Sequence, residues 1–190
     1  MSGYHHGDLR AALIEAGLEL TKTGGPDALT IREATRRVGV SPNAAYRHFA
    51  DREALLQAVG TAVQHRMTER MRASVRRRTP TELLRAVGLG YIKFALDEPG
   101  WFAVAFFGTE QFAETGSAPP YLALVEALDA MVEAGLLSRK RRDGAEWPCW
   151  SAVHGFAELA LHGPLRGASR REVESLAART VDDIIAGLSR

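Results

Sequence analysis

The sequence has little of what stabilises small secreted proteins or zinc-binding modules. Its 190 residues include one cysteine, Cys149, which excludes an internal disulfide framework and the paired-cysteine zinc motifs. No export signal is visible, and the longest aromatic-rich apolar run, WFAVAFF at 101–107, is far short of the ~20 residues that a membrane span needs. We therefore expect a cytoplasmic protein with no membrane partner.

Sequence motifs of the common enzyme classes are also missing. There is no phosphate loop, dinucleotide fingerprint, nucleophile elbow or His-Glu-x-x-His motif. These absences argue against an enzyme, and we expect no cofactor. We therefore expect the protein to act by binding a partner.

Histidine-based metal binding is the one route by which an enzyme remains an alternative. His154, Glu158 and His162 follow one another at i, i+4 and i+8, so a metal-dependent helical enzyme would use His154 and Glu158. The two outer residues are ~12 Å apart along a helix axis, which is too far for one ion. His5 and His6 are adjacent on the chain and make a poor metal cage. We predict no metal site at either place.

Charge is unevenly distributed although the net charge is only +1. Residues 1–80 contain 13 Lys or Arg and 8 Asp or Glu, a balance of +5, whereas residues 81–190 contain 11 and 15, a balance of −4. A basic first part followed by an acidic remainder is typical of a protein whose first part meets a polyanion. A solvated surface is the competing explanation, and charge alone does not decide between them.

Apolar residues recur at helical spacing along almost the whole chain. Leu9, Leu13, Ala16 and Leu20 illustrate the pattern, and there is no sustained alternation of period two. We predict an all-α protein of about nine helices, a three-helix N-terminal head and a larger C-terminal helical bundle. The expected helices are 8–23, 30–38, 42–48, 52–77, 80–97, 99–111, 119–137, 146–163 and 169–188.

Helix starts are marked by capping residues. Asp8 and Asp51 are candidate N-caps, and Ser41 followed by Pro42 fits an N-cap with proline at the first helical position. Reciprocal capping boxes are expected at three further starts, Thr30 with Glu33, Thr79 with Glu82 and Ser169 with Glu172.

The stretch VGVSPNAAYRHF, residues 38–49, predicts a helix-turn-helix. Two short helices are separated by a turn at Gly39 and Val40, and the glycine allows the positive φ that such a turn requires. Val40, Ala45 and Phe49 are expected in the core. The outward side is then left to Pro42, Asn43, Ala44, Tyr46, Arg47 and His48.

This outward side suits a DNA duplex. Backbone N–H groups near Thr30 and Ser41 would bind phosphates, Ala44 permits close approach to base edges, and Asn43 would bond a base. Donors for phosphate are expected from Tyr46, His48 and Arg52. An ordinary solvent-exposed helical corner is the alternative.

The segment LTIREATRRVGVSPNAAYRHFADREALLQAV, residues 29–59, resembles the DNA-binding segment of the TetR family of bacterial transcriptional regulators. YHHGDLRAALIEAGLEL, residues 4–20, resembles the way in which many members begin. The resemblance implies that Thr30 and Arg32 start the supporting helix, that residues 41–44 face bases, and that Tyr46, His48 and Arg52 contact phosphates. One departure is Ala34 and Thr35, where the family usually has a bulky aliphatic residue followed by alanine. Weaker packing under the motif is therefore expected.

A single short recognition helix covers few base pairs, so two copies are expected on a palindromic operator. The last two helices carry wide apolar stripes with small residues, Ala157, Ala160, Ala177 and Ala178, that would allow close packing in a homodimer. The alternative is that these stripes complete the core of one chain. Resemblance to the family favours the dimer.

Aromatic residues concentrate in the second part of the chain. A cavity for a small-molecule effector is expected there, with His154 as a polar group, although such residues are also typical of a core. WSAVHG, residues 150–155, resembles a Trp-x-x-x-His-Gly signature of one TetR subgroup. The expected lining residues are Tyr91, Phe94, Trp101, Phe102, Phe106, Phe107, Trp147, Trp150 and His154.

These observations predict a sequence-specific DNA-binding regulator in which residues 1–52 form the helix-turn-helix domain and residues 53–190 bind an effector and dimerise. We expect a repressor that a small apolar molecule releases from DNA. A helical scaffold that does not bind DNA is the remaining alternative, and a salt titration on DNA distinguishes the two.

Overall fold

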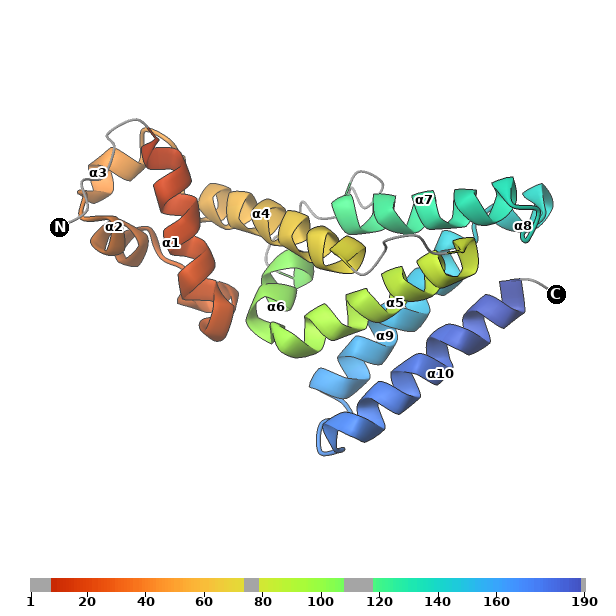
Figure 1. The fold of residues 1–190 in the computed structure, drawn as a ribbon. Coiled ribbons are helices and arrows are strands. Elements are labelled where there is room, and N and C mark those ends of the chain that lie inside the picture. The colour runs from red at the N-terminus through yellow and green to blue at the C-terminus, as the bar shows by residue number, and fades with distance from the viewer. Residues whose placement is uncertain (1–7, 74–78, 108–117, 189–190) are drawn as a thin grey trace. The chain divides into compact units, whose positions relative to one another are not determined.

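The computed structural model describes residues 8–73, 79–107 and 118–188, and these contain ten α-helices, one 3-10 helix and no strand. The all-α prediction is confirmed (Figure 1). In chain order the elements are α1 (Leu9–Gly24), η1 (Pro26–Ala28), α2 (Ile31–Val38), α3 (Pro42–Ala45), α4 (Arg52–Ala73), α5 (Pro80–Asp97), α6 (Pro99–Phe107), α7 (Pro119–Glu133), α8 (Arg139–Arg142), α9 (Glu146–Leu161) and α10 (Arg170–Leu188).

The helices form two compact units. The described part of the first unit comprises residues 8–64 and 98–107, and that of the second comprises residues 65–97 and 118–188. The division falls inside α4 and places α6 with the N-terminal helices, whereas the sequence suggested a single boundary after residue 52. The reason is that α6 packs on α1, a contact between segments about 80 residues apart.

Most predicted N-caps make their bonds. The amides of Ala11 and Ala54 donate to the carboxylates of Asp8 and Asp51 over 2.9 and 2.8 Å. The box at Thr79 closes in both directions, because the Thr79 amide donates to Glu82 (2.9 Å) and the Glu82 amide donates to the Thr79 hydroxyl (3.3 Å). Ser41 holds the N-cap position of α3 but its side chain makes no capping bond.

The helix α8 was not predicted, since it lies between the expected helices 119–137 and 146–163. Ser138 begins this single turn by accepting from the Arg141 amide over 3.3 Å. The Arg141 guanidinium then donates to the Gly187 carbonyl (2.7 Å) near the C-terminal end of α10. A cation at this end satisfies a carbonyl that the helix itself leaves without a partner. Tertiary contact therefore accounts for α8.

Three buried contacts hold α6 against the rest of the first unit. The Trp101 indole donates to the Leu18 carbonyl over 2.8 Å, and the Gln64 amide donates to the Ala105 carbonyl over 3.1 Å. Gly100 lies so close to α1 that an added β-carbon would clash with the carbonyl oxygens of Thr21 and Lys22. The first turn of α6 therefore requires glycine at this position.

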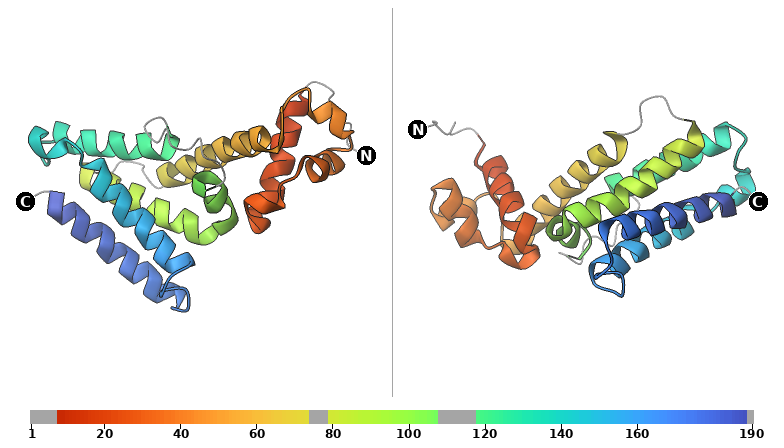
Figure 2. Two further views of the ribbon diagram at one scale, coloured as in Figure 1. Left: turned by 180° about the vertical axis from the view of Figure 1, so that it is seen from behind. Right: turned by 60° about the horizontal axis from the view of Figure 1, so that its bottom comes forward.

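In the second unit α5 is the central helix and packs against α7, α9 and α10 (Figure 2). Its inward residues Tyr91, Ile92 and Phe94 are each 1% exposed. None of the helices in the described stretches is long and apolar enough to span a bilayer.

Candidate functional site

The helix-turn-helix is built on Gly39. Its φ of 79° is in the left-handed region, where glycine is favoured because it has no Cβ. The amides of Gly39 and Val40 both donate to the Thr35 carbonyl, over 2.9 and 3.0 Å, which ends α2 and turns the chain into α3. The helix α3 is one turn long, shorter than the expected 42–48, and residues 46–48 continue as turns with the His48 amide bonded to the Ala45 carbonyl (2.9 Å).

The packing beneath the motif is tight in spite of the unusual pair at positions 34 and 35. Ala34 and Ala45 are 0% exposed, Thr35 is 1% exposed and Phe49 is 3% exposed. The Thr35 hydroxyl donates within its own helix to the Ile31 carbonyl (2.8 Å), so its burial leaves no unsatisfied donor. The weaker packing expected at this pair is therefore not found.

The residues assigned to DNA lie mostly on the outside of the motif. Ala44 is half-buried, and the other members that the sequence placed on α2, α3 and the following turn are exposed: Thr30, Arg32, Ser41, Pro42, Asn43, Tyr46, Arg47 and His48. Tyr46 is 53% exposed. Exposure of an aromatic ring to water is unfavourable, so such a ring is often covered by a binding partner. Their contacts with bases and phosphates remain predictions.

The cations of the head differ in how far they are neutralised. Arg36 pairs with Glu33 (2.6 Å), which holds the pKa of that carboxyl below its usual value, and Arg37 pairs with Glu19 (3.0 Å). Arg32 and Arg47, by contrast, make no ion pair within the described part of the chain. These two side chains have their charge available for phosphate.

Arg52 has a structural role that the sequence did not suggest. Its guanidinium donates to the backbone carbonyls of Leu29 (2.7 Å) and Pro26 (2.5 Å). These hydrogen bonds connect the start of α4 to the segment before α2. Because two of its three nitrogens are bound to carbonyls, this geometry disfavours the phosphate contact expected of Arg52.

Arg10 was not singled out from the sequence, yet it lies beside the motif. Its guanidinium carbon is 5.3 Å from the centre of the Phe49 ring, a cation–π distance, and the side chain is exposed. Nothing local in the sequence reveals this contact, because 39 residues separate the pair.

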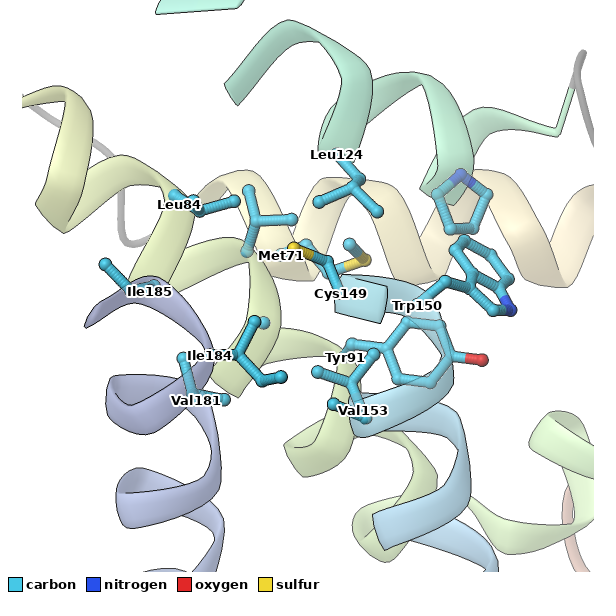
Figure 3. A pocket seen from close by; sticks show the side chains of 14 residues that line it. Met71, Leu84, Tyr91, Leu124, Cys149, Trp150, Val153, Val181, Ile184 and Ile185 are labelled. Carbon is cyan, nitrogen blue, oxygen red and sulfur yellow. The ribbon is translucent and has the colours of Figure 1, made fainter. Parts of the chain in front are cut away.

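The second unit contains a small, partly open apolar cavity with about 30 Å³ of free space. Helices α4, α5, α7, α9 and α10 supply its walls (Figure 3), with Met71, Tyr91, Leu124, Trp150 and Ile185 as examples. Its walls have almost no polar lining, which suits an apolar ligand, and they must move apart to admit a small molecule.

Two of the predicted aromatics, Tyr91 and Trp150, line this cavity, and their rings meet edge to face at 5.3 Å. Phe94 is core, with Arg70 over its ring at 5.4 Å. Trp147 is 55% exposed and does not line the cavity.

The predicted lining residues on α6 belong to the first unit. Trp101, Phe102 and Phe106 do not line the cavity, since α6 packs on α1. The side chain of Phe107 lies outside the described residues. Spacing along the sequence does not reveal which of two cores an aromatic helix joins.

His154 is bonded to Tyr91 rather than to a metal-binding partner. The Tyr91 hydroxyl and His154 Nδ1 are 2.8 Å apart. Burial raises the pKa of Tyr91 and lowers that of His154, so both groups are neutral near pH 7. Glu158 is paired instead with His162 (3.0 Å), and no group of three potential ligands occurs among the described residues. His5 and His6 lie outside the described residues.

Cys149 is a cavity residue that sequence reasoning missed. Its side chain is 6% exposed, and burial, with a smaller effect of Glu146, raises the pKa of the thiol to about 11. A thiol with this pKa is almost wholly protonated at neutral pH and is a poor nucleophile.

Comparison with known proteins agrees with this geometry. Residues 13–59 match the family described as bacterial regulatory proteins, tetR family, and residues 84–184 match the tetracyclin repressor-like C-terminal domain. The chain is 21% identical over 147 residues to an uncharacterised HTH-type transcriptional regulator, YobS, of Bacillus subtilis (strain 168), which covers 77% of this chain and 76% of YobS.

Solved structures show the same fold. A protein of unknown function from Rhodococcus sp. RHA1 has a TM-score of 0.79 and 27% identity over the whole of both chains. A TetR variant from Acinetobacter baumannii AYE in complex with minocycline has a TM-score of 0.68 and 23% identity over 94% of each chain. Together, the helix-turn-helix and the two family matches show that this chain belongs to the TetR family and is a DNA-binding transcriptional regulator.

Proposed function

We propose that this regulator is a cytoplasmic repressor that binds a palindromic operator as a homodimer and is released when a small apolar molecule enters the cavity. The observation that carries the proposal is that one chain contains both an exposed polar helix-turn-helix and a second unit with an apolar cavity. Repression requires that the effector binds the two conformations with different affinity, because equal affinity shifts nothing.

DNA recognition is assigned to the exposed start of α3 and the turn after it. Selection of bound fragments from a random DNA pool should return a palindrome whose half-sites are about one helical turn apart. Asn43→Ala should then change the preferred base at one position per half-site, at ~1–3 kcal/mol. Unchanged selectivity across an operator library would remove Asn43 from base recognition.

Phosphate contacts are assigned to Arg32 and Arg47, which form no ion pair with any described residue, and to Arg10 beside Phe49. Each contact should contribute about 0.9 to the slope of log affinity against log salt. An Arg10→Gln variant that keeps the full slope would show that Arg10 only packs on the ring.

The dimer is assigned to the outer faces of α9 and α10. The small residues that the sequence suggested for this surface are mostly inside the chain, since Ala157, Ala160 and Ala177 are 0%, 8% and 4% exposed. The exposed face of α9 instead presents Ser151, Gly155 and Leu159. A β-carbon added at Gly155 would meet nothing within 4 Å, so the chain itself has no use for a helical glycine that costs ~1 kcal/mol.

Close approach of a partner helix explains Gly155. We expect Gly155→Leu to convert the dimer into a monomer in light scattering and to abolish operator binding, with helix content unchanged by circular dichroism. Gly167→Leu is the matched control, because Gly167 has equally open surroundings but lies in the loop before α10. Dimers in both variants would exclude this surface.

We also propose that the chain belongs to the Trp-x-x-x-His-Gly subgroup, whose three signature residues would have different roles. Trp150 lines the cavity, His154 holds the Tyr91 hydroxyl, and Gly155 is on the outer face. The signature would thus combine effector binding and dimerisation on one helix. Calorimetric screening of apolar compounds, followed by operator release, tests the effector role, and binding without release would contradict it.

A further inference from the structure

One buried polar atom in the second unit has no partner among the described residues. Glu158 Oε2 is bonded to His162, but Glu158 Oε1 is shielded from solvent and accepts no hydrogen bond from the described residues. The Glu158 side chain as a whole is 35% exposed, but this oxygen is shielded. A shielded carboxylate oxygen without a donor is unfavourable enough that native structures rarely retain one without a functional reason.

This carboxylate belongs to a polar cluster that begins at the cavity wall. The Tyr91 ring lines the cavity, its hydroxyl bonds to His154, and Glu158 follows one turn further along α9, ~6 Å in axial rise. Trp150, His154 and Glu158 are at i, i+4 and i+8, and all three are partly buried. In Figure 3 the Tyr91 hydroxyl extends away from Ile184 and Ile185, which mark the apolar side of the cavity.

A carboxylate, that of Glu158, lies close enough to Tyr91 and His154 to affect the pKa of both. Glu158 is the charged group that acts on both Tyr91 and His154: it raises the pKa of Tyr91 further, and for His154 it opposes the lowering caused by burial. The side chain of His162, which is paired with Glu158 Oε2, is 67% exposed. Water therefore screens the interaction between His162 and the negative charge of Glu158.

We infer that the effector carries a protonated amine on an apolar body. The body enters the cavity against Tyr91 and Trp150 as the apolar walls move apart, and the ammonium group donates to Glu158 Oε1 past the Tyr91–His154 pair. This inference rests on the proposed effector role of the cavity and adds the chemical class of the ligand. A charge-assisted hydrogen bond in a partly dehydrated site is strong enough to dominate selection among ligands of equal size.

Three naphthalene derivatives of matched shape test the inference: 1-naphthylmethylamine, 1-naphthalenemethanol and 1-naphthoic acid, which are cationic, neutral and anionic at pH 7. Affinities for the full-length protein are measured by calorimetry. We expect the amine to bind about tenfold or more tightly than the alcohol, and the acid to bind most weakly.

The decisive variant is Glu158→Gln, which keeps the shape of the side chain and removes its charge. The amine should lose about tenfold in affinity while the alcohol is unchanged, so that the alcohol reports an intact cavity. Glu133→Gln, an exposed position at the end of α7, removes the same charge elsewhere and should alter neither ligand.

Two results would overturn the inference. Equal affinities of amine and alcohol in the unaltered protein, or an amine preference that survives Glu158→Gln, would remove Glu158 from ligand recognition while the effector cavity remains in place. If none of the three compounds binds, the inference and the effector role of this cavity both fail. Release of operator DNA, measured separately, tests the proposed function.

Discussion

Replacement of Arg52 by alanine distinguishes a structural residue from a DNA-contacting one. In the structure its guanidinium donates two hydrogen bonds, to the carbonyls of Leu29 and Pro26. Hydrogen bonds from a charged donor contribute ~1.5–3 kcal/mol each, and the lower value applies because the group is only partly buried. The variant should therefore lose about 3 kcal/mol of unfolding free energy.

For a chain of this size that loss lowers Tm by about 6 to 12 °C. Thermal unfolding followed by circular dichroism measures it. Operator binding at a temperature at which the variant is folded is then titrated with salt, and the slope should equal that of the unaltered protein. Arg47→Ala is the matched control, because it removes an exposed, unpaired cation and should lower the slope by about 0.9 without changing Tm.

The opposite pattern would refute the reasoning. If Arg52→Ala keeps its Tm but loses about one unit of salt slope, the guanidinium binds phosphate and the two carbonyl contacts contribute little.

Three further variants probe the cores and the cavity. Gly100→Ala should lower Tm by several degrees, because its β-carbon would clash with the Thr21 and Lys22 carbonyls; an unchanged Tm would mean that α6 shifts freely. Trp101→Phe should cost ~1–3 kcal/mol in a denaturant titration, since the buried Leu18 carbonyl loses its donor. The Cys149 thiol should resist iodoacetamide at pH 8 until the protein unfolds. Because its folded pKa is raised from 9.0 to about 11, it contributes stability that is present below pH 9 and lost as pH rises towards 11, and Cys149→Ala should flatten that decline.

Local features of the chain were predictable because their causes are local. The N-caps at Asp8, Thr30 and Asp51 and the left-handed Gly39 depend on atoms within four residues, and all four were expected. The single-turn helix α8 was missed for the complementary reason, since Arg141 is stabilised by Gly187, 46 residues away.

The candidate site was predictable in part. The exposed face of the helix-turn-helix follows from a helical period that leaves the polar side chains outside. The cavity was less accessible to this reasoning, because a periodic apolar stripe shows that a side chain is buried but not against what. Trp150 and Trp101 look alike in sequence, yet one lines the cavity and the other bonds to α1.

The sequence by itself determined that the chain is helical, where most helices begin, and which short corner presents polar residues, because backbone propensity and periodicity act over a few residues. Tertiary structure alone decided that α6 joins the head, that Arg52 binds carbonyls, and that Glu158 is left with a shielded, unpaired oxygen. These outcomes depend on contacts between segments far apart in the chain, whose geometry no local pattern encodes.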